Sequence, residues 1–227
     1  MIHIIGGHGG DTDQPLLDSM FEARKRLFVD LLDWDLEVVD GRLEIDRFDD
    51  AYATYIVFAG ADGRHRASMR LLPSTRPHLL GSMFERLCTA GVPVGPAIFE
   101  ITRLCLPTTV VAAERKRLRD ALIRAMVDHA LAVGISTFTG VVTARFREAI
   151  LAMGWEGEAL GPGQDMGGGR LGAFAIHIDV HTPARLEANG IYALGEVEAG
   201  AHAGRGSAQA PGAAPGPAHG PLAGETA

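Results

Sequence analysis

The residues best placed to do chemistry are four carboxylates within seven positions, just after the loop around Gly41. They are Glu44, Asp46, Asp49 and Asp50. Carboxylates in a loop can bind cations or ammonium groups, although acid clusters in loops are more often only solvated. A calcium loop is not predicted, because the alternating ligands and the central glycine of that motif are missing. A functional role for this cluster therefore depends on whether positively charged groups can contact it.

Three cations and one further acid interrupt segments that are otherwise apolar. Arg24 lies in an apolar helical stripe, Arg70 in a short apolar run, and Glu100 and Arg103 in another. Because buried charges need partners, such sets mark either ion-pair networks or sites that hold a charged small molecule. Arg24 alone could equally run its stem along the stripe to water. Flat alternation puts Glu100 and Arg103 on opposite faces, so either a bulge brings them together or they serve different surfaces.

A second charged feature is a basic segment at the start of a predicted helix. Cations are unfavourable there, because the helix dipole favours anions at its N-terminus. The segment is either a solubilising face or a docking site for a phosphate or an acidic carrier protein. Its basic residues are Arg115, Lys116, Arg117 and Arg119.

Other candidates are weaker. His177, Asp179 and His181 would share one face of a strand, but three ligands without a fourth favour a structural role over a metal site. The stretch 161–172 is glycine-rich and is expected to be a mobile loop. The sequence has no dinucleotide fingerprint, GxSxG, P-loop or HExxH motif, so hydrolase, nucleotide triphosphatase and zinc protease activities lack support.

The elements that must position these residues follow from apolar periodicity and turn signals. Helices are predicted over 16–31 and 114–133, the second closed by Gly134, and a short helix capped by Thr143 ends at Gly154. Strands are predicted over 52–59, 67–72, 98–106, 138–143 and 173–180, the first two as a hairpin. Strands in series with helices before and between them predict the α/β class, a single-domain αβα sandwich around a mixed sheet.

Composition sets the limits of this assignment. The chain has 227 residues, of which 47% are hydrophobic, and a formal charge of −7. The excess of acids argues against nucleic-acid binding, and no apolar run is long enough to span a membrane. Cys88 and Cys105 form no disulfide framework, so a cytoplasmic protein is expected. From Ala199 onward 21 of 29 residues are Ala, Gly or Pro, which predicts a catalytic domain over 1–198 and a flexible tail over 199–227.

Taken in order, the marked residues resemble the acyl-homoserine-lactone synthases, the LuxI-type autoinducer synthases. The resemblance covers about eighty residues of the first half of the chain, and an ordered set is more specific than any motif within it. It weakens after Pro107, although a strand, a helix and Gly154-Trp155 follow in the expected order. The matching positions are Arg24–Phe28, Trp34, Glu44–Asp49, Arg70–Thr75, Phe84 and Phe99–Arg103.

The resemblance implies a fold like that of GNAT acyltransferases and a role in quorum sensing. In such a reaction the amine of S-adenosylmethionine attacks an acyl thioester, and the methionine carboxylate then displaces methylthioadenosine to close the homoserine lactone. S-adenosylmethionine is thus a substrate, and neither a cofactor nor a metal is implied. The donor would be acyl carrier protein, docked on the basic helix, or acyl-coenzyme A. The product would act on a separate receptor.

The resemblance also implies residue roles. Glu100 would be the general base, directly or through one water, and Arg103 would be the partner that keeps it ionised. Arg24→Ala would abolish activity while the protein stays folded. The remaining catalytic candidates are Arg24, Asp46, Asp49 and Arg70, and the remaining substrate-binding candidates are Phe28, Trp34, Glu44, Phe84 and Thr102.

The prediction about the acyl group of the substrate depends on the strand expected over residues 138–143. Relatives that make 3-oxo products tend to carry a threonine where this chain has Gly140, with Thr139 and Thr143 nearby. A missing hydroxyl would leave a 3-oxo group without its hydrogen-bond partner. The expected acyl chain is therefore unsubstituted, and Gly140 and Thr143 are its predicted contacts. Two other functions stay open at this point. One is a GNAT-like N-acyltransferase that acylates another amine without lactonisation, and the other is a non-catalytic module that binds S-adenosylmethionine or carrier protein.

Overall fold

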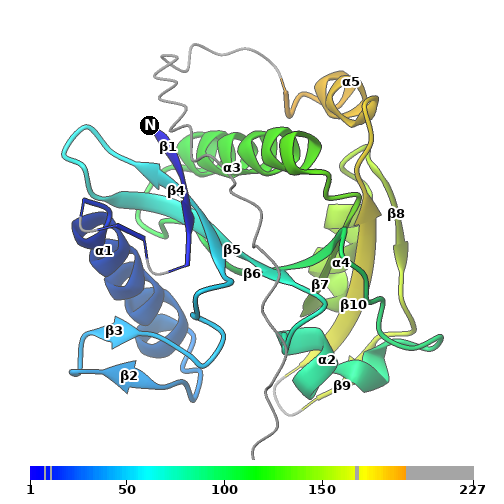
Figure 1. Cartoon of the computed structure of the whole chain (residues 1–227), viewed down its shortest axis with the longest axis horizontal. Coiled ribbons are helices and arrows are strands. Elements are labelled where there is room, and N and C mark those ends of the chain that lie inside the picture. The colour runs from blue at the N-terminus through cyan, green and yellow to red at the C-terminus, as the bar shows by residue number, and fades with distance from the viewer. Residues whose placement is uncertain (8, 11, 167–168, 193–227) are drawn as a thin grey trace, which may run out of the picture.

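An eight-stranded mixed sheet organises the protein (Figure 1), described by a computed structural model over residues 1–7, 9–10, 12–166 and 169–192. The strand order is β1-β4-β5-β6-β7-β10-β8, with β9 paired to β10. Every pairing is antiparallel except β6 with β7. The strands are β1 (Ile2–Gly6), β4 (Thr54–Ala59), β5 (His65–Pro73), β6 (Ile98–Cys105), β7 (Thr137–Thr143), β8 (Glu156–Ala159), β9 (Gln164–Asp165) and β10 (Arg170–His177).

Helices cover both faces of this sheet and make a three-layer sandwich. One face carries α1, its π-helical continuation η1 and the short helix α2, and the other carries α3 and α4. A two-stranded hairpin of β2 and β3 lies beside α1. The helical elements are α1 (Gln14–Arg24), η1 (Lys25–Leu31), α2 (Leu79–Met83), η2 (Glu85–Leu87), α3 (Ala112–Val133), α4 (Ala144–Leu151) and α5 (Thr182–Ala188); the hairpin strands are β2 (Val38–Val39) and β3 (Leu43–Glu44).

Alternation along the strands divides the core in two. Ile56 and Leu71 face α3 and pack with Leu118 and Leu122. Their neighbours on the same strands, including Tyr55 and Leu72, face α1 instead. This period of two is what allows one strand to serve both layers. The face under α1 and α2 is also the one that carries the candidate site.

The predicted sandwich is confirmed, as are the 52–72 hairpin, the end of α3 at Gly134 (φ +80°) and the capping of α4 by Thr143. Three expectations were incomplete. The last strand is β10, which ends at His177 rather than at residue 180. The stretch 161–172, expected to be a loop, contains β9 and the start of β10. Strands β1 and β8 are not among the predicted strands. In β8 the signal is missing because the strand is exposed along its whole length and shows no apolar alternation.

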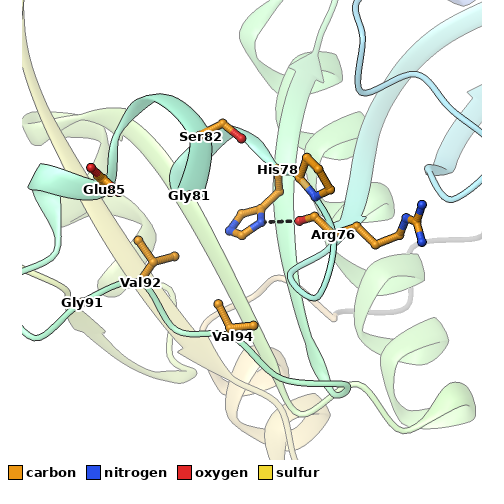
Figure 2. A pocket seen from close by; sticks show the side chains of 9 residues that line it. Arg76, His78, Gly81, Ser82, Glu85, Gly91, Val92 and Val94 are labelled. Atoms are coloured by element: carbon orange, nitrogen blue, oxygen red, sulfur yellow. Dashed lines mark hydrogen bonds between the residues drawn. The ribbon is translucent and has the colours of Figure 1, made fainter.

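A surface cavity of about 480 Å³ lies beside α2 (Figure 2). Its walls include Arg76, His78, Gly81, Ser82 and Val92. The Nδ1 of His78 donates to the Arg76 carbonyl at 2.8 Å, which fixes the ring just before the first turn of α2. No helix within the described residues is long and apolar enough to cross a membrane. The predicted tail over 199–227 lies outside the described residues.

Candidate active site

A tight turn after β3 places the acidic side chains against the sheet. The Asp46 amide donates to the Asp49 carboxylate at 2.8 Å, and the Phe48 amide donates to the Asp46 carboxylate at 2.8 Å. Phe48 is buried in the core under α1 and anchors the turn. Asp50 points elsewhere and accepts from the Tyr52 amide. The predicted cluster of four therefore contributes three carboxylates to the site, because Asp50 only stabilises its own turn.

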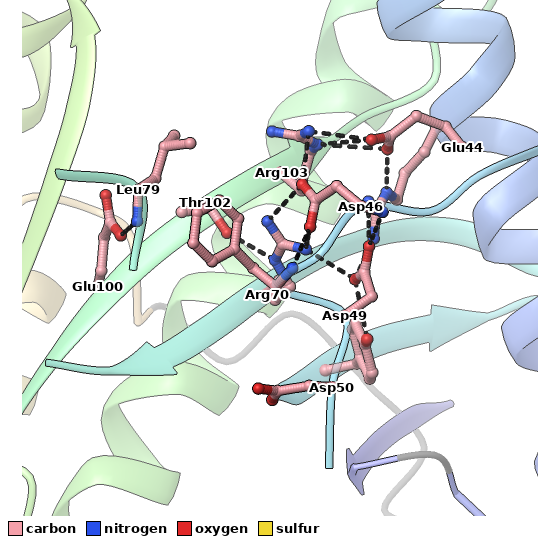
Figure 3. Close-up of polar contacts among 12 residues, drawn as sticks. Glu44, Asp46, Asp49, Asp50, Arg70, Leu79, Glu100, Thr102 and Arg103 are labelled. Atoms are coloured by element: carbon pink, nitrogen blue, oxygen red, sulfur yellow. Dashed lines mark hydrogen bonds and ion pairs between the residues drawn. The ribbon is translucent and has the colours of Figure 1, made fainter. Parts of the chain in front are cut away.

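Three arginines from three elements contact these three carboxylates, and Figure 3 shows the network around Arg70 and Arg103. Arg24, at the end of α1, donates to both oxygens of Asp49 at 2.8 Å and to Glu44. Arg70 of β5 donates to both oxygens of Asp46, at 2.6 and 3.0 Å, and forms an ion pair with Asp49 at 2.8 Å. Such paired, planar contacts are the strong form of a charge-assisted hydrogen bond. The expectation that these charges need partners is confirmed, and the alternative in which Arg24 reaches water is wrong.

Burial makes this pairing obligatory. The side chains of Arg24, Glu44 and Asp49 are at most 1% exposed, whereas that of Asp46 is 15% exposed. Burial alone would lower the pKa of the Arg24 guanidinium, but Asp49 and Glu44 more than offset it and hold that pKa above its ordinary value. Burial would likewise raise the pKa of Asp49, but Arg24 and Arg70 hold it below its usual range. Arg24 and Asp49 therefore stay ionised, and Asp46 is the carboxylate of the set most open to a ligand.

Arg103 joins the network because β6 bulges at this residue. Its φ is +51°, and the β5–β6 register shifts between Ser68 and Arg70. An αL residue in a bulge turns its side chain out of the strict alternation. Arg103 consequently donates to Glu44 at 2.9 Å and to Asp46 at 2.8 Å. Of the two arrangements left open by the sequence, the bulge is present and turns Arg103 to the face that carries Glu100, but it does not pair the two side chains.

Glu100 lies on the same face but is held separately. Its two carboxylate oxygens accept from the backbone amides of Leu79 and Leu80 at 2.7 and 2.9 Å, at the first turn of α2. The predicted pairing with Arg103 is wrong, since Arg103 contacts Glu44 and Asp46 instead. Burial raises the pKa of Glu100 to about 7, despite the two amides and the more distant arginines, which lower it. A carboxylate with that pKa can accept and return a proton at neutral pH.

Two aromatic rings border the arginines. Phe28, in the π-helical segment η1, stacks on Trp34 with ring centroids 5.0 Å apart and an interplanar angle of 21°. The Arg103 guanidinium lies 5.5 Å from the centre of the Phe28 ring. Phe28 is buried, whereas Trp34 is 48% exposed. An open indole face beside a charge network can cover an adenine ring or a sulfonium cation.

The other predicted substrate contacts differ in what they touch. The Thr102 hydroxyl accepts from Arg70 at 2.9 Å and belongs to the network. Phe84 packs against a small core between α2 and β10. The Thr143 hydroxyl caps α4 by accepting from the Phe146 amide, so its observed role is structural. A Cβ at Gly140 would lie 2.7 Å from the Phe174 ring, on the opposite face of the sheet from Glu100.

The basic start of α3 is partly neutralised by two acids of its own helix, Glu114 and Asp120. Arg117 donates to both oxygens of Glu114, and Lys116 and Arg119 both contact Asp120. Arg115 donates to the Pro107 carbonyl. These contacts explain how four cations are tolerated near a helix N-terminus. The segment therefore offers less free positive charge to a partner than its sequence suggests.

Sequence reasoning missed three groups of the site. The Tyr55 hydroxyl donates to Asp49 at 2.9 Å, and burial next to Asp49 holds the pKa of that hydroxyl above its ordinary value. Tyr55 lies among apolar neighbours, and only its polar tip could have marked it. The amides of Leu79 and Leu80 carry no side-chain signal, and α2, with five residues, is too short to show a period.

The described part of the chain contains no cluster of three or more His, Cys, Asp or Glu side chains that could hold a metal. His177 ends β10, while Asp179 and His181 lie beyond it, where Asp179 accepts from the His181 amide and from Arg185. The idea that the three share a strand face is therefore wrong.

Comparison with known proteins agrees with this geometry. Residues 11–186 match the family model described as autoinducer synthase. An acyl-homoserine-lactone synthase of Ralstonia nicotianae is 31% identical over 185 residues, which cover 79% of this chain and 91% of that protein. The structure of the synthase LasI has a TM-score of 0.73 at 25% identity and covers 83% of this chain and 94% of its own. BjaI, a coenzyme A-dependent synthase solved with S-adenosylmethionine and isopentyl-CoA, has a TM-score of 0.72 at 25% identity, over 83% and 87%.

Proposed function

This chain belongs to the autoinducer synthase family and is an acyl-homoserine-lactone synthase, and we propose how its residues carry out that reaction. The substrates are S-adenosylmethionine and an acyl thioester, and the site lies on the sheet face between α1 and α2. The observation that carries the assignment is Glu100, a fully buried carboxylate with a near-neutral pKa, held by two amides beside a neutral network of three arginines and three acids.

S-adenosylmethionine would bind against the accessible edge of that network. Its ammonium group meets Asp46, the most exposed of the three carboxylates, and its carboxylate meets Arg103, whose side chain is 6% exposed. The sulfonium and adenine lie along the Trp34 face. The carboxylate oxygens of Glu44 and Asp49 are already occupied by the arginines and the Tyr55 hydroxyl, so their role is to hold the arginines in place. The resulting orientation brings the amine toward Glu100.

The acyl thioester would enter where β6 and β7 separate. The two strands pair only from Ile98 with Thr137 to Glu100 with Thr139, although both continue beyond this point. The bound ammonium group first gives up one proton to solvent, which leaves a neutral amine. The amine nitrogen then attacks the thioester carbon, and its second proton passes to the Glu100 carboxylate. The tetrahedral intermediate then collapses to the amide and expels the sulfur, which leaves as a thiol after taking a proton from Glu100.

Lactonisation needs no further acid or base. A methionine carboxylate oxygen attacks the carbon bonded to the sulfonium, and that carbon–sulfur bond breaks to release neutral methylthioadenosine. The reaction removes a positive charge from sulfur and a negative charge from the carboxylate together. No cofactor or metal takes part in this scheme.

The donor is proposed to be acyl carrier protein, as expected from the sequence, with acyl-coenzyme A as the alternative. The internally paired cations of α3 weaken the case for a carrier contact at that helix. A comparison of kcat/KM for the same acyl group on both donors tests the choice. A lower KM for the carrier-bound form, raised again by Arg115→Glu, would support carrier docking, and indifference to the carrier would point to coenzyme A.

The function itself is tested by incubating the purified chain with labelled S-adenosylmethionine and a panel of acyl thioesters. Release of methylthioadenosine, with an equal amount of acyl-homoserine lactone by mass spectrometry, is expected. An acylated amine without methylthioadenosine would indicate a plain N-acyltransferase. Binding of S-adenosylmethionine without turnover across the whole panel would indicate a binding module.

A further inference from the structure

One buried hydroxyl next to the proposed base has no partner. Within the described residues, the buried side-chain atoms without a hydrogen bond are His78 Nε2, Thr139 Oγ1 and Arg185 Nε. Thr139 is fully buried. Leaving such a group unsatisfied costs about 1–3 kcal/mol, so orphaned polar atoms in native proteins usually mark a place where a ligand or a water completes the contact.

The sheet register places this hydroxyl beside Glu100. Thr139 on β7 is the direct partner of Glu100 on the parallel strand β6, and partners in register point to the same face. The preceding pair, Phe99 and Phe138, packs into the core under α3. Glu100 and Thr139 therefore share the opposite face, at the last pair before the two strands separate.

The other hydroxyls of β7 are not available for this role. Thr143 caps α4, and Thr137 contacts the His177 ring. Gly140 has no hydroxyl and faces Phe174. Thr139 is consequently the one side-chain hydroxyl of this strand that is both buried and free on the Glu100 face.

Thr139 and Glu100 together have the hydrogen-bonding capacity to hold one water. Each Glu100 oxygen accepts one amide hydrogen bond and keeps a second lone pair. No direct hydrogen bond joins the two side chains, and neighbouring buried polar groups that do not bond directly are commonly bridged by a water with two to four polar partners. Glu100 and Thr139 supply two partners, and the substrate amine supplies a third.

We propose that Thr139 is a positioning residue, whose hydroxyl holds against Glu100 the water that carries the proton away from the attacking amine. As nitrogen bonds to the thioester carbon, its proton moves to the water and a water proton moves to the Glu100 carboxylate. The departing sulfur takes a proton back by the same route, so water and base are regenerated. This role rests on the proposed function, because it requires an amine nucleophile.

The groups that set the charge state of Glu100 come from every element around it. Arg70 on β5 and Arg103 on β6 favour the ionised form, as do the α2 amides, while burial opposes it. Cys88, after η2, has a thiol whose pKa is raised by burial and, to a smaller extent, by the nearby Glu100. Thr139 adds a neutral partner from β7. Loss of the bridging water would remove one donor from the ionised carboxylate and raise the pKa of Glu100 further.

The test compares Thr139→Val, which keeps shape and β-branching but removes the hydroxyl, with Thr139→Ser, which keeps the hydroxyl. Methylthioadenosine release is followed from pH 5.5 to 9 at saturating substrates. We expect Thr139→Val to lower kcat by about tenfold to a hundredfold with KM values within twofold, and to move the acidic limb of the profile upward. Thr139→Ser should keep at least half of the wild-type rate.

Wild-type kcat and pH profile in Thr139→Val would overturn the proposal. So would equal losses in both variants, which indicate a packing role, or a change confined to the donor KM, which indicates contact with the acyl chain. A carbon-13 NMR titration of Glu100, assigned with Glu100→Gln, gives a reading that does not depend on turnover. An unchanged Glu100 pKa in Thr139→Val refutes the bridge even if the wild-type chain proves to have another activity.

Discussion

Replacing Arg24 with alanine should destabilise the protein, and not only inactivate it. The guanidinium is 1% exposed and donates to Glu44 and to both oxygens of Asp49. Removing one partner of a buried ion pair typically costs 3–5 kcal/mol, because the other charge stays buried without compensation. Glu44 keeps Arg103 and Asp49 keeps Arg70, so the low end applies, about 3 kcal/mol. The sequence-based expectation that this variant stays folded is not tested by the structure, but the burial of both acid partners of Arg24 argues against it.

Thermal unfolding followed by circular dichroism measures the effect. For a domain of this size about 3 kcal/mol lowers Tm by roughly 6–12 °C. Arg42→Ala is the matched control, because Arg42 also pairs with a glutamate but its side chain is 64% exposed. An exposed pair contributes under about 1 kcal/mol, so the control should lower Tm by no more than about 4 °C.

Acid sensitivity gives a second reading of the same variant. The pKa of Asp49 is held below its ordinary value in the folded state, so its contribution to stability is present above the unfolded pKa and is lost as pH falls. Arg24→Ala should weaken that contribution and make the difference in Tm from wild type smaller at pH 3 than at pH 7. A Tm for Arg24→Ala within 2 °C of wild type at pH 7 would refute the idea that this network is a buried, mutually dependent set.

Three further outcomes follow from the site. Glu100→Gln should lower kcat by about a hundredfold or more and change the KM for S-adenosylmethionine by no more than a few-fold. Initial-rate assays at pH 7.5 measure both constants, and a kcat near that of wild type would rule out Glu100 as the general base. Trp34→Ala should raise the KM for S-adenosylmethionine about tenfold with Tm unchanged, because the ring is half exposed; Trp34→Phe should recover part of it, and an unaltered KM would exclude the indole from the binding face. Gly140→Thr should lower stability by about 1–3 kcal/mol in urea unfolding through its clash with Phe174, and a stable variant with a new 3-oxo product would contradict that geometry.

The sequence predicts most of the fold because periodic apolar residues and turn signals agree along the chain. The hairpin of β4 and β5, the long helix α3 and the cap at Thr143 all follow from local pattern. It fails where pattern is weak. The exposed strand β8 has no buried face, and α2 has too few residues to show a period.

The sequence predicts which residues belong to the site better than it predicts which of them contact one another. Charges that interrupt apolar segments correctly identified Arg24, Arg70 and Arg103, because no other signal explains a buried guanidinium. Their partners could not be assigned, since the bulge at Arg103 depends on one αL residue and reverses the side on which its side chain lies. Glu100 was assigned the wrong partner for the same reason. Its true partners are backbone amides, which no sequence pattern displays.

The raised pKa that suits Glu100 to the proposed role of base also lowers the stability of the folded protein at neutral and higher pH. Its pKa is raised from about 4.5 to about 7, so above pH 4.5 the folded state retains a proton that the unfolded state releases. Stability contributed by this group is therefore complete at low pH and declines as pH rises through 7, the reverse of Asp49. Near pH 8 the deficit is about 3 kcal/mol, which the paired network and the two α2 amides must offset. A base tuned by burial, as proposed for Glu100, thus needs a rigid, charge-balanced surrounding, and this explains why a network of three arginines and three acids adjoins a carboxylate that bonds to none of them.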